Sequence, residues 1–214
     1  MYERYSGRLV SNIKPEFNYQ VSVMKDIKKD EWAIVLDFLA HGHHGMERSQ
    51  PVAQVLGDKY FSLLEVIIRE DITLKPEDRL YIGDAKRDKV KYIRGRIDFG
   101  ELTVAAKEEL NYIIEEIVKN DQARFLEFFN KAGPISTRLH QIELLPGIGR
   151  RHLWAIINER KSKPFESFDD LKKRVPLLPD PEKMIIRRIL EELEDEKEKH
   201  RIFVPKLERE RHSR

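Results

Sequence analysis

Cysteine is absent from the 214 residues of the chain. This absence excludes disulfide bonds and thiolate metal sites, and it is typical of proteins that remain inside the cell. Long apolar runs are also absent, which excludes a membrane-spanning helix, and residues 1–17 lack the apolar core of a secretory signal. We therefore expect a cytoplasmic protein that does not contact a membrane.

Motifs that carry catalysis are lacking as well. The sequence contains no Gly-x-Ser-x-Gly elbow, no P-loop and no dinucleotide-binding fingerprint, and its many acidic residues form no paired motif. A large excess of one charge is missing too, because 40 Lys and Arg residues against 38 Asp and Glu residues leave a net charge of +2. We expect a binding protein rather than an enzyme, and any affinity for a polyanion must come from local patches.

The first hundred residues favour β-structure. Short apolar runs separated by glycine and proline predict five strands, at residues 19–23, 32–39, 60–68, 80–82 and 90–97. Five short strands close together in sequence predict a small barrel or a curled sheet. An OB-like barrel is the best match, although five strands are compatible with other topologies.

After Gly100 the apolar residues follow helical spacing. The residues from Leu102 to Val118 place one apolar face along a helix, and a second helix follows around residues 125–129. Further along, Ser167 with an acidic residue three positions later predicts a helix start, and Pro181 suits the first turn of the last helix.

The most informative segment is residues 144–149, with the sequence LLPGIG. Apolar residues at helical spacing precede and follow it, and Pro146 ends the first helix because its ring disfavours helical geometry at the preceding residue. Gly147 and Gly149 permit positive φ and place no side chain between the backbone and a ligand. The second helix then begins with free N–H groups and the positive end of its dipole, which predicts an anion site.

This segment resembles the helix-hairpin-helix motif, which binds nucleic acid without sequence specificity. In proteins with this motif, amides of the hairpin and of the next helix hold two phosphates of one strand, sometimes with a bound monovalent cation. The resemblance implies that the phosphate ligands in this chain are Gly147, Ile148, Gly149, Arg150 and Arg151. The alternative is an ordinary tight connection between two helices.

A degenerate second hairpin follows the first. The run PFESFDDL at 164–171 resembles the linker of tandem helix-hairpin-helix domains, such as that of the bacterial competence DNA receptor, in which a second hairpin follows. At the matching place, residues 175–181 read VPLLPDP without a glycine, so the resemblance carries the architecture but not the amide cradle. Positive charge remains, because residues 147–190 contain 11 basic and 6 acidic residues. We predict that Lys183, Arg187 and Arg188 also contact phosphate.

Together these patterns predict an α+β protein in which a small N-terminal β-barrel-like (OB-like) domain precedes an all-α tandem helix-hairpin-helix domain. The predicted regions are an N-terminal extension at 1–17, the β domain at 18–100, connecting helices at 101–133, the helix-hairpin-helix domain at 134–195 and a charged tail at 196–214.

The β domain offers a second candidate surface at residues 86–96, which hold six basic residues and one acidic residue. Cations interleaved with an aromatic ring are what a single-strand groove requires, because charges follow the backbone while the ring stacks on a base. The alternative is a solvated edge strand protected by long charged side chains. The candidate ligands are Lys89, Lys91, Tyr92 and Arg94.

Histidines gather in one loop, where His41, His43 and His44 could supply metal ligands. Adjacent His43 and His44 point apart in an extended chain, and the neighbouring glycines do not orient them. We expect no metal here, and metal-dependent hydrolysis at this loop is a rival function. Around the hairpin, we expect Trp154 to be buried and His140 and His152 to lie on helix surfaces.

From about residue 18 to residue 195, the chain is similar to an archaeal conserved protein family of unknown function. The runs that carry this resemblance are VLDFLAHGH, YFSLLEVI, AKEELNYIIEEIVKN, FFNKAGPISTRLHQIELLPGIG and ERKSKPFESFDDL. The resemblance implies an OB-like part joined to a helix-hairpin-helix part, with nucleic-acid binding and no assigned catalytic residue. We expect the backbone of DNA or RNA to be the partner, and a protein-binding adaptor is the other rival function. The oligomeric state is left open.

Overall fold

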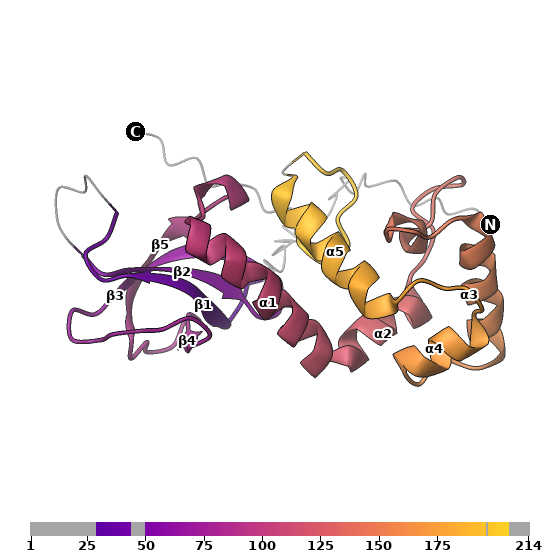
Figure 1. The fold of residues 1–214 in the computed structure, drawn as a ribbon, viewed down its shortest axis with the longest axis horizontal. Coiled ribbons are helices and arrows are strands. Elements are labelled where there is room, and N and C mark those ends of the chain that lie inside the picture. Colours follow the sequence, from indigo (N-terminus) through magenta and orange to yellow (C-terminus); the bar gives the residue numbers. More distant parts are fainter. Residues whose placement is uncertain (1–28, 44–49, 196, 206–214) are drawn as a thin grey trace, which may run out of the picture.

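The computed structural model describes residues 29–43, 50–195 and 197–205 (Figure 1). The strands are β1 Trp32–Leu39, β2 Val52–Gly57, β3 Leu63–Ile68, β4 Arg79–Tyr81 and β5 Val90–Arg96. The helices are α1 Val104–Asn120, α2 Gln122–Lys131, α3 Arg150–Ser162, α4 Phe168–Arg174 and α5 Pro181–Glu194, with short 3-10 helices η1 Phe99–Glu101 and η2 Gln141–Leu144. Among the described residues, no helix is both long and apolar enough to cross a membrane. The described strands come before the described helices, so the chain is a mixed α+β protein, as the sequence predicts.

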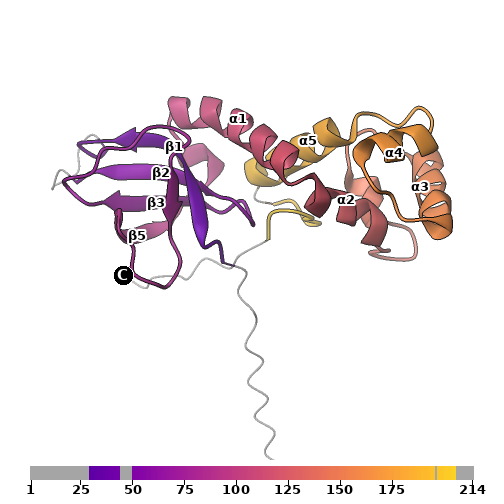
Figure 2. The ribbon, with the colours of Figure 1, turned by 90° about the horizontal axis from the view of Figure 1, so that it is seen from below.

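The five strands form one antiparallel sheet in the order β4-β1-β2-β3-β5. The sheet is curled (Figure 2), and β4 and β5 are its two edges. Within the described residues these edge strands do not pair with each other, so the sheet is a half-barrel rather than a closed barrel.

Strand β2 is absent from the sequence prediction. Every residue from Val52 to Gly57 is buried, because both faces of the sheet are covered at this strand. A strand buried on both faces shows no alternation of polar and apolar residues, so its sequence carries no strand signal of period two. The predicted strand at residues 19–23 lies outside the described residues.

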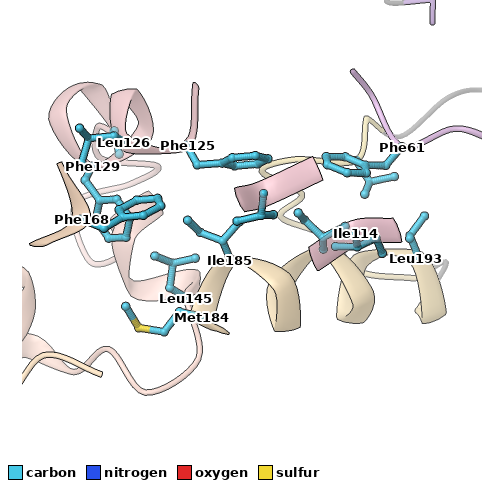
Figure 3. Close-up of a cluster of buried hydrophobic side chains, with 14 of the residues drawn as sticks. Phe61, Ile114, Phe125, Leu126, Phe129, Leu145, Phe168, Met184, Ile185 and Leu193 are labelled. Carbon is cyan, nitrogen blue, oxygen red and sulfur yellow. The ribbon is translucent and has the colours of Figure 1, made fainter. Parts of the chain in front are cut away.

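Two apolar clusters cover the two faces of the sheet. One contains Val35, Val55 and Val66 from the strands and is completed by residues of the long connections between strands. The other begins at Leu36 and continues through α1, α2 and α5 as far as Ile156 of α3. Figure 3 shows this second cluster, in which side chains from the sheet end, from α1 and from the hairpin region meet. One face of the sheet and the helices thus share the second cluster as their core.

Polar side chains of the sheet hold the start of α1. Thr103 is the N-cap of this helix, and its hydroxyl accepts a hydrogen bond from the amide of Ala106 at 3.0 Å. The same hydroxyl donates to Asp37 of β1 at 2.7 Å, while the Thr103 amide donates to the buried side chain of Gln54 in β2 at 2.9 Å. The capping residue is therefore fixed by two neighbouring strands.

The predicted helix before the hairpin is reduced to the four residues of η2. Leu145 after it is extended, with φ −74° and ψ 134°, as the following Pro146 requires. The other helix starts agree with the sequence. Ser167 caps α4 by accepting the amide of Asp170 at 3.0 Å, and Pro181 is the first residue of α5.

The chain after α5 folds back onto the helices. The carboxylate of Glu192, 0% exposed, accepts hydrogen bonds from the three amides of residues 202–204 at 2.7, 2.9 and 2.8 Å. Arg188 donates its Nε to the same carboxylate at 2.8 Å. Part of the predicted charged tail at 196–214 is thus held against α5, because a buried acid of this helix binds the backbone of residues 202–204.

Replacing Glu192 by alanine should lower the free energy of unfolding by about 3–5 kcal/mol, because the change removes the carboxylate that binds the buried Arg188 guanidinium and the amides of residues 202–204. Urea denaturation of the full chain measures this difference. Glu194→Ala is the matched control, since Glu194 is exposed on the same helix, and it should change the free energy by less than about 0.5 kcal/mol. Equal effects of the two substitutions would show that the Glu192 contacts contribute nothing specific.

Candidate nucleic-acid interface

The first hairpin is a tight turn between η2 and α3. The amide of Ile148 donates to the carbonyl of Leu145 at 3.2 Å, and Gly147 has φ +83°. A proline at the second position and a positive φ at the third are the features of a type II turn. Ile148 packs against the hydrophobic core, so the turn is anchored by its apolar residue and exposes its glycines.

The two glycines of this hairpin have different structural roles. Gly147 is needed by the fold, because its φ is positive and an added Cβ would lie 3.3 Å from Cγ of Pro179 in the second hairpin. Gly149 has an ordinary φ of −106°, and an added Cβ would meet nothing within 4 Å. The folded chain itself therefore gives no reason for a glycine at position 149.

The amides at the start of α3 are left open. Gly149 is the N-cap and has no side chain to accept a hydrogen bond, and no described residue accepts the amides of Arg150 or Arg151. Side chains cap α1, α4 and α5, whereas α2, which begins directly after α1, lacks a side-chain cap as α3 does. Free N–H groups at a helix N-terminus form an anion site.

The basic residues predicted around this site divide into exposed and buried ones. Arg150 is exposed and is oriented by Glu143 at 3.3 Å and by the carbonyl of Arg138 at 3.0 Å. Arg151 is exposed on the same helical turn. Arg150 and Arg151 can therefore both reach a ligand at the first hairpin.

On α5, Lys183 is exposed, and Arg187 is exposed beside Glu191 at 3.0 Å. Arg188 is only 5% exposed, and its guanidinium binds Glu192 and the backbone of residues after α5. The prediction that Arg188 contacts phosphate is wrong, because its charge is directed into the protein.

The second hairpin repeats the turn of the first without its glycine. The amide of Leu178 donates to the carbonyl of Val175 at 3.3 Å, and Leu177 has φ +63° at the position that Gly147 occupies in the first hairpin. The N-terminus of α5 is already capped, because the Asp180 carboxylate accepts the amide of Lys183 at 3.1 Å. The start of α5 therefore already has a carboxylate as the acceptor of one of its amides, unlike the start of α3.

Two side chains near the hairpin differ from their predicted environments. Trp154 is 54% exposed on α3, so the prediction of a buried indole is wrong and an open aromatic face lies one turn after the basic pair. His140 is buried rather than on a helix surface, and its Nδ1 accepts the amide of Ile142 at 3.2 Å. Burial and the nearby Arg160 charge lower the pKa of His140, so its imidazole is a neutral cap of η2 rather than a phosphate ligand.

A monovalent cation at the hairpin would need backbone carbonyl ligands, because residues 145–149 carry no side-chain oxygen. The carbonyl of Leu145 already accepts the amide of Ile148. An anion at the start of α3 would need only the amides and the two arginines as ligands.

Three candidate residues of the sheet lie on edge strand β5, and Lys89 directly precedes it. The pairing of β5 with β3 is irregular at Lys91 and at Arg94, which interrupt the register as bulges do. Arg94 pairs with the buried Glu65 at 3.0 Å, and the Tyr92 hydroxyl donates to Gln50 at 3.2 Å. Bulges and paired charges are features of a protected sheet edge.

The histidine loop does not assemble a metal site among the described residues. Nε2 of His43 contacts the carboxylate of Glu65, which Arg94 also binds. No group of three or more His, Cys, Asp or Glu residues is placed to hold a metal within residues 29–43, 50–195 and 197–205. His44 lies outside the described residues.

Two open pockets of about 480 and 510 Å³ border α2. The first is lined by aromatic and basic side chains of α2, of the β2–β3 connection and of the segment after α5, and the second by residues of α2 and of the α3–α4 connection. Neither includes a residue of the two hairpins. The first hairpin is therefore an exposed surface rather than a cavity.

The two hairpin glycines should respond differently to substitution. Gly147→Ala should lower the free energy of unfolding by about 1–2 kcal/mol, because a side chain is unfavourable at positive φ. Gly149→Asp should leave it unchanged or raise it by a few tenths of a kcal/mol, because aspartate is a good N-cap. Thermal denaturation of the two variants measures the difference, and an equal loss in both would contradict the described geometry.

Comparisons with known proteins agree with the resemblance found in the sequence. A family model described as a protein of unknown function (DUF655) matches residues 29–205. The uncharacterised protein MJ0038 of Methanocaldococcus jannaschii is 41% identical over 181 residues, which cover 84% of this chain and 82% of that protein. A crystal structure of Af1531 from Archaeoglobus fulgidus is similar with a TM-score of 0.74 and 45% identity, covering 82% of this chain and 100% of that chain. The chain therefore belongs to the DUF655 family of archaeal proteins.

Proposed function

We propose that this protein binds the phosphate backbone of nucleic acid through its first hairpin, without strong sequence specificity. The ligands are the amides of Gly149, Arg150 and Arg151, reinforced by the two arginine side chains. Lys183 and Arg187 of α5 add positive charge beside them. In this proposal residues 134–195 are a tandem helix-hairpin-helix domain whose second hairpin no longer binds phosphate, and the sheet is an OB-like half-barrel.

The glycine at position 149 is the observation that carries this proposal. Its φ is ordinary and its Cβ position is open, so the fold would accept most side chains there. Aspartate or serine would cap α3 better than glycine does. A glycine that leaves the helix uncapped is explained when a ligand approaches the backbone closely and supplies the missing acceptor.

The chemistry of these protein groups determines which features of a nucleic acid they can distinguish. Backbone amides and arginine charges recognise phosphate oxygens, which are the same at every nucleotide, so they fix position without reading sequence. DNA and RNA present the same phosphate group, and both are included in the proposal.

The rival functions predict different behaviour. A metal-dependent hydrolase would contain stoichiometric metal bound at the His41–His44 loop in the purified protein. An adaptor would bind a protein partner with an affinity that depends little on salt, and it would not bind nucleic acid.

Gly149→Asp should abolish most of the nucleic-acid affinity while the protein remains folded. The new carboxylate would cap the open amides and repel phosphate, as Asp180 does at the second hairpin. Fluorescence anisotropy with labelled single-stranded and double-stranded DNA and RNA, together with a melting curve of the variant, measures both properties. If a folded Gly149→Asp variant binds as tightly as the parent, the first hairpin is only a structural turn.

Salt dependence locates the phosphate contacts. Replacing Arg150 and Arg151 by alanine should reduce the slope of log affinity against log salt concentration by about two, because each phosphate contact contributes about one. The matched control is Lys89→Ala with Lys91→Ala, which removes two exposed cations from the β5 region. A reduced slope in this control alone would place the contacts on the sheet instead.

A further inference from the structure

Leu177 is unfavourable in two ways that the fold does not compensate. Its φ of +63° lies in the left-handed region that favours glycine, and its side chain is 79% exposed. A glycine would remove the strain, and a polar side chain would remove the exposed apolar surface. Strain of this kind in a native protein is typical of functional positions.

The leucine lies at the tip of the second hairpin, beside the first. Leu177 and Gly147 occupy the same position of two equivalent turns, and Pro179 is the residue that an added side chain on Gly147 would contact. The two hairpins therefore form one continuous surface. On this surface the first hairpin presents open amides and the second presents an apolar side chain.

The sequence neighbours of Leu177 are basic. Lys173 of α4 is exposed just before the second hairpin, and Lys183 is exposed in the first turn of α5. Lys172 pairs with Asp169 at 2.9 Å, and Arg174, whose side chain is 17% exposed, binds Glu159 and Asp170, so the free positive charge comes from the two lysines. The Asp180 carboxylate between them is bound to the start of α5. The second hairpin thus has an apolar tip with basic residues on both sides. A matching ligand is a polyanion with an apolar interior, and a nucleic acid has both features, because its bases stack inside a phosphate backbone.

We propose that Leu177 is a wedge that enters a nucleic-acid duplex where base stacking is weak. This inference rests on the proposed function, and it names the ligand class as duplex with a bulge, mismatch or nick. Apolar side chains inserted between base steps unstack them, and the cost of unstacking is lowest where the stack is already interrupted. The first hairpin would hold the backbone, and Leu177 would select the distorted site.

The experiment compares a short intact duplex with the same duplex carrying a single-nucleotide bulge. The parent protein should bind the bulged duplex about tenfold more tightly, because the duplex has already lost the stacking that the wedge would otherwise disrupt. A fluorescent base analogue beside the bulge should brighten on binding as it becomes unstacked. Full-length protein and fluorescence anisotropy are used for every variant.

Two substitutions remove the wedge without straining the turn. Leu177→Gly relieves the positive φ, and Leu177→Asn introduces a residue that tolerates this region. Both variants should melt at or above the temperature of the parent and retain its affinity for intact duplex within about twofold, since the phosphate contacts are unchanged. Both should lose the preference for the bulge and the signal of the base analogue. Val104→Asn is the control, because Val104 is 75% exposed on α1 and lies outside the hairpins.

The outcomes separate this inference from the proposed function. If the parent binds neither duplex, the wedge is overturned, and the proposed function fails as well when single-stranded DNA and RNA are also not bound. If the parent binds both duplexes equally, or if Leu177→Asn keeps the preference, the wedge is overturned while phosphate binding stands. Equal losses for both duplexes in the Leu177 variants would show a general contact and would also overturn the wedge.

Discussion

Helix α1 buries one apolar face against two partners, and the relative position of the sheet and the hairpins depends on that face. The helix contacts both β1 and α5. Leu110, Ile113 and Ile114 are buried along it, and burying each such side chain stabilises the fold by about 1.5–3 kcal/mol. Because the same face of α1 contacts both β1 and α5, moving α5 away would expose apolar side chains of α1. The second hairpin precedes α5 and contacts the first, so both are held by this packing.

Regular patterns in the sequence predict most of the fold, and the failures share a physical cause. The run Trp32–Leu39 has the same bounds in the prediction and in the structure because its amino acids favour strands locally. Strand β2 has no alternation because both of its faces are buried by residues distant in sequence. The segment of residues 197–205 is ordered by a carboxylate of α5, and no local pattern records such a contact.

In the candidate site too, the features set by local sequence are predictable and those set by tertiary packing are not. The turn and the open amides of the first hairpin follow from local sequence. The adjacent Arg187 and Arg188 look alike, since each has a glutamate four residues later, yet only Arg187 is exposed. Which arginine faces solvent depends on how α5 packs, and that is a tertiary property. Asp180 directly before Pro181 does carry a local signal, because this pair is typical of a capped helix start, and that signal indicates a blocked second hairpin.

The binding of residues 202–204 by Glu192 has a consequence for the order in which the protein folds during synthesis. In the described part of the chain every strand precedes residue 97, so the sheet residues are synthesised before the helices. Helix α5 is different, because its buried carboxylate gains its amide donors only after residues 202–204 have emerged from the ribosome. The final packing of α5 therefore has to wait for residues that follow Glu192 by 10 to 12 positions along the chain, even though the rest of the helix has already been synthesised.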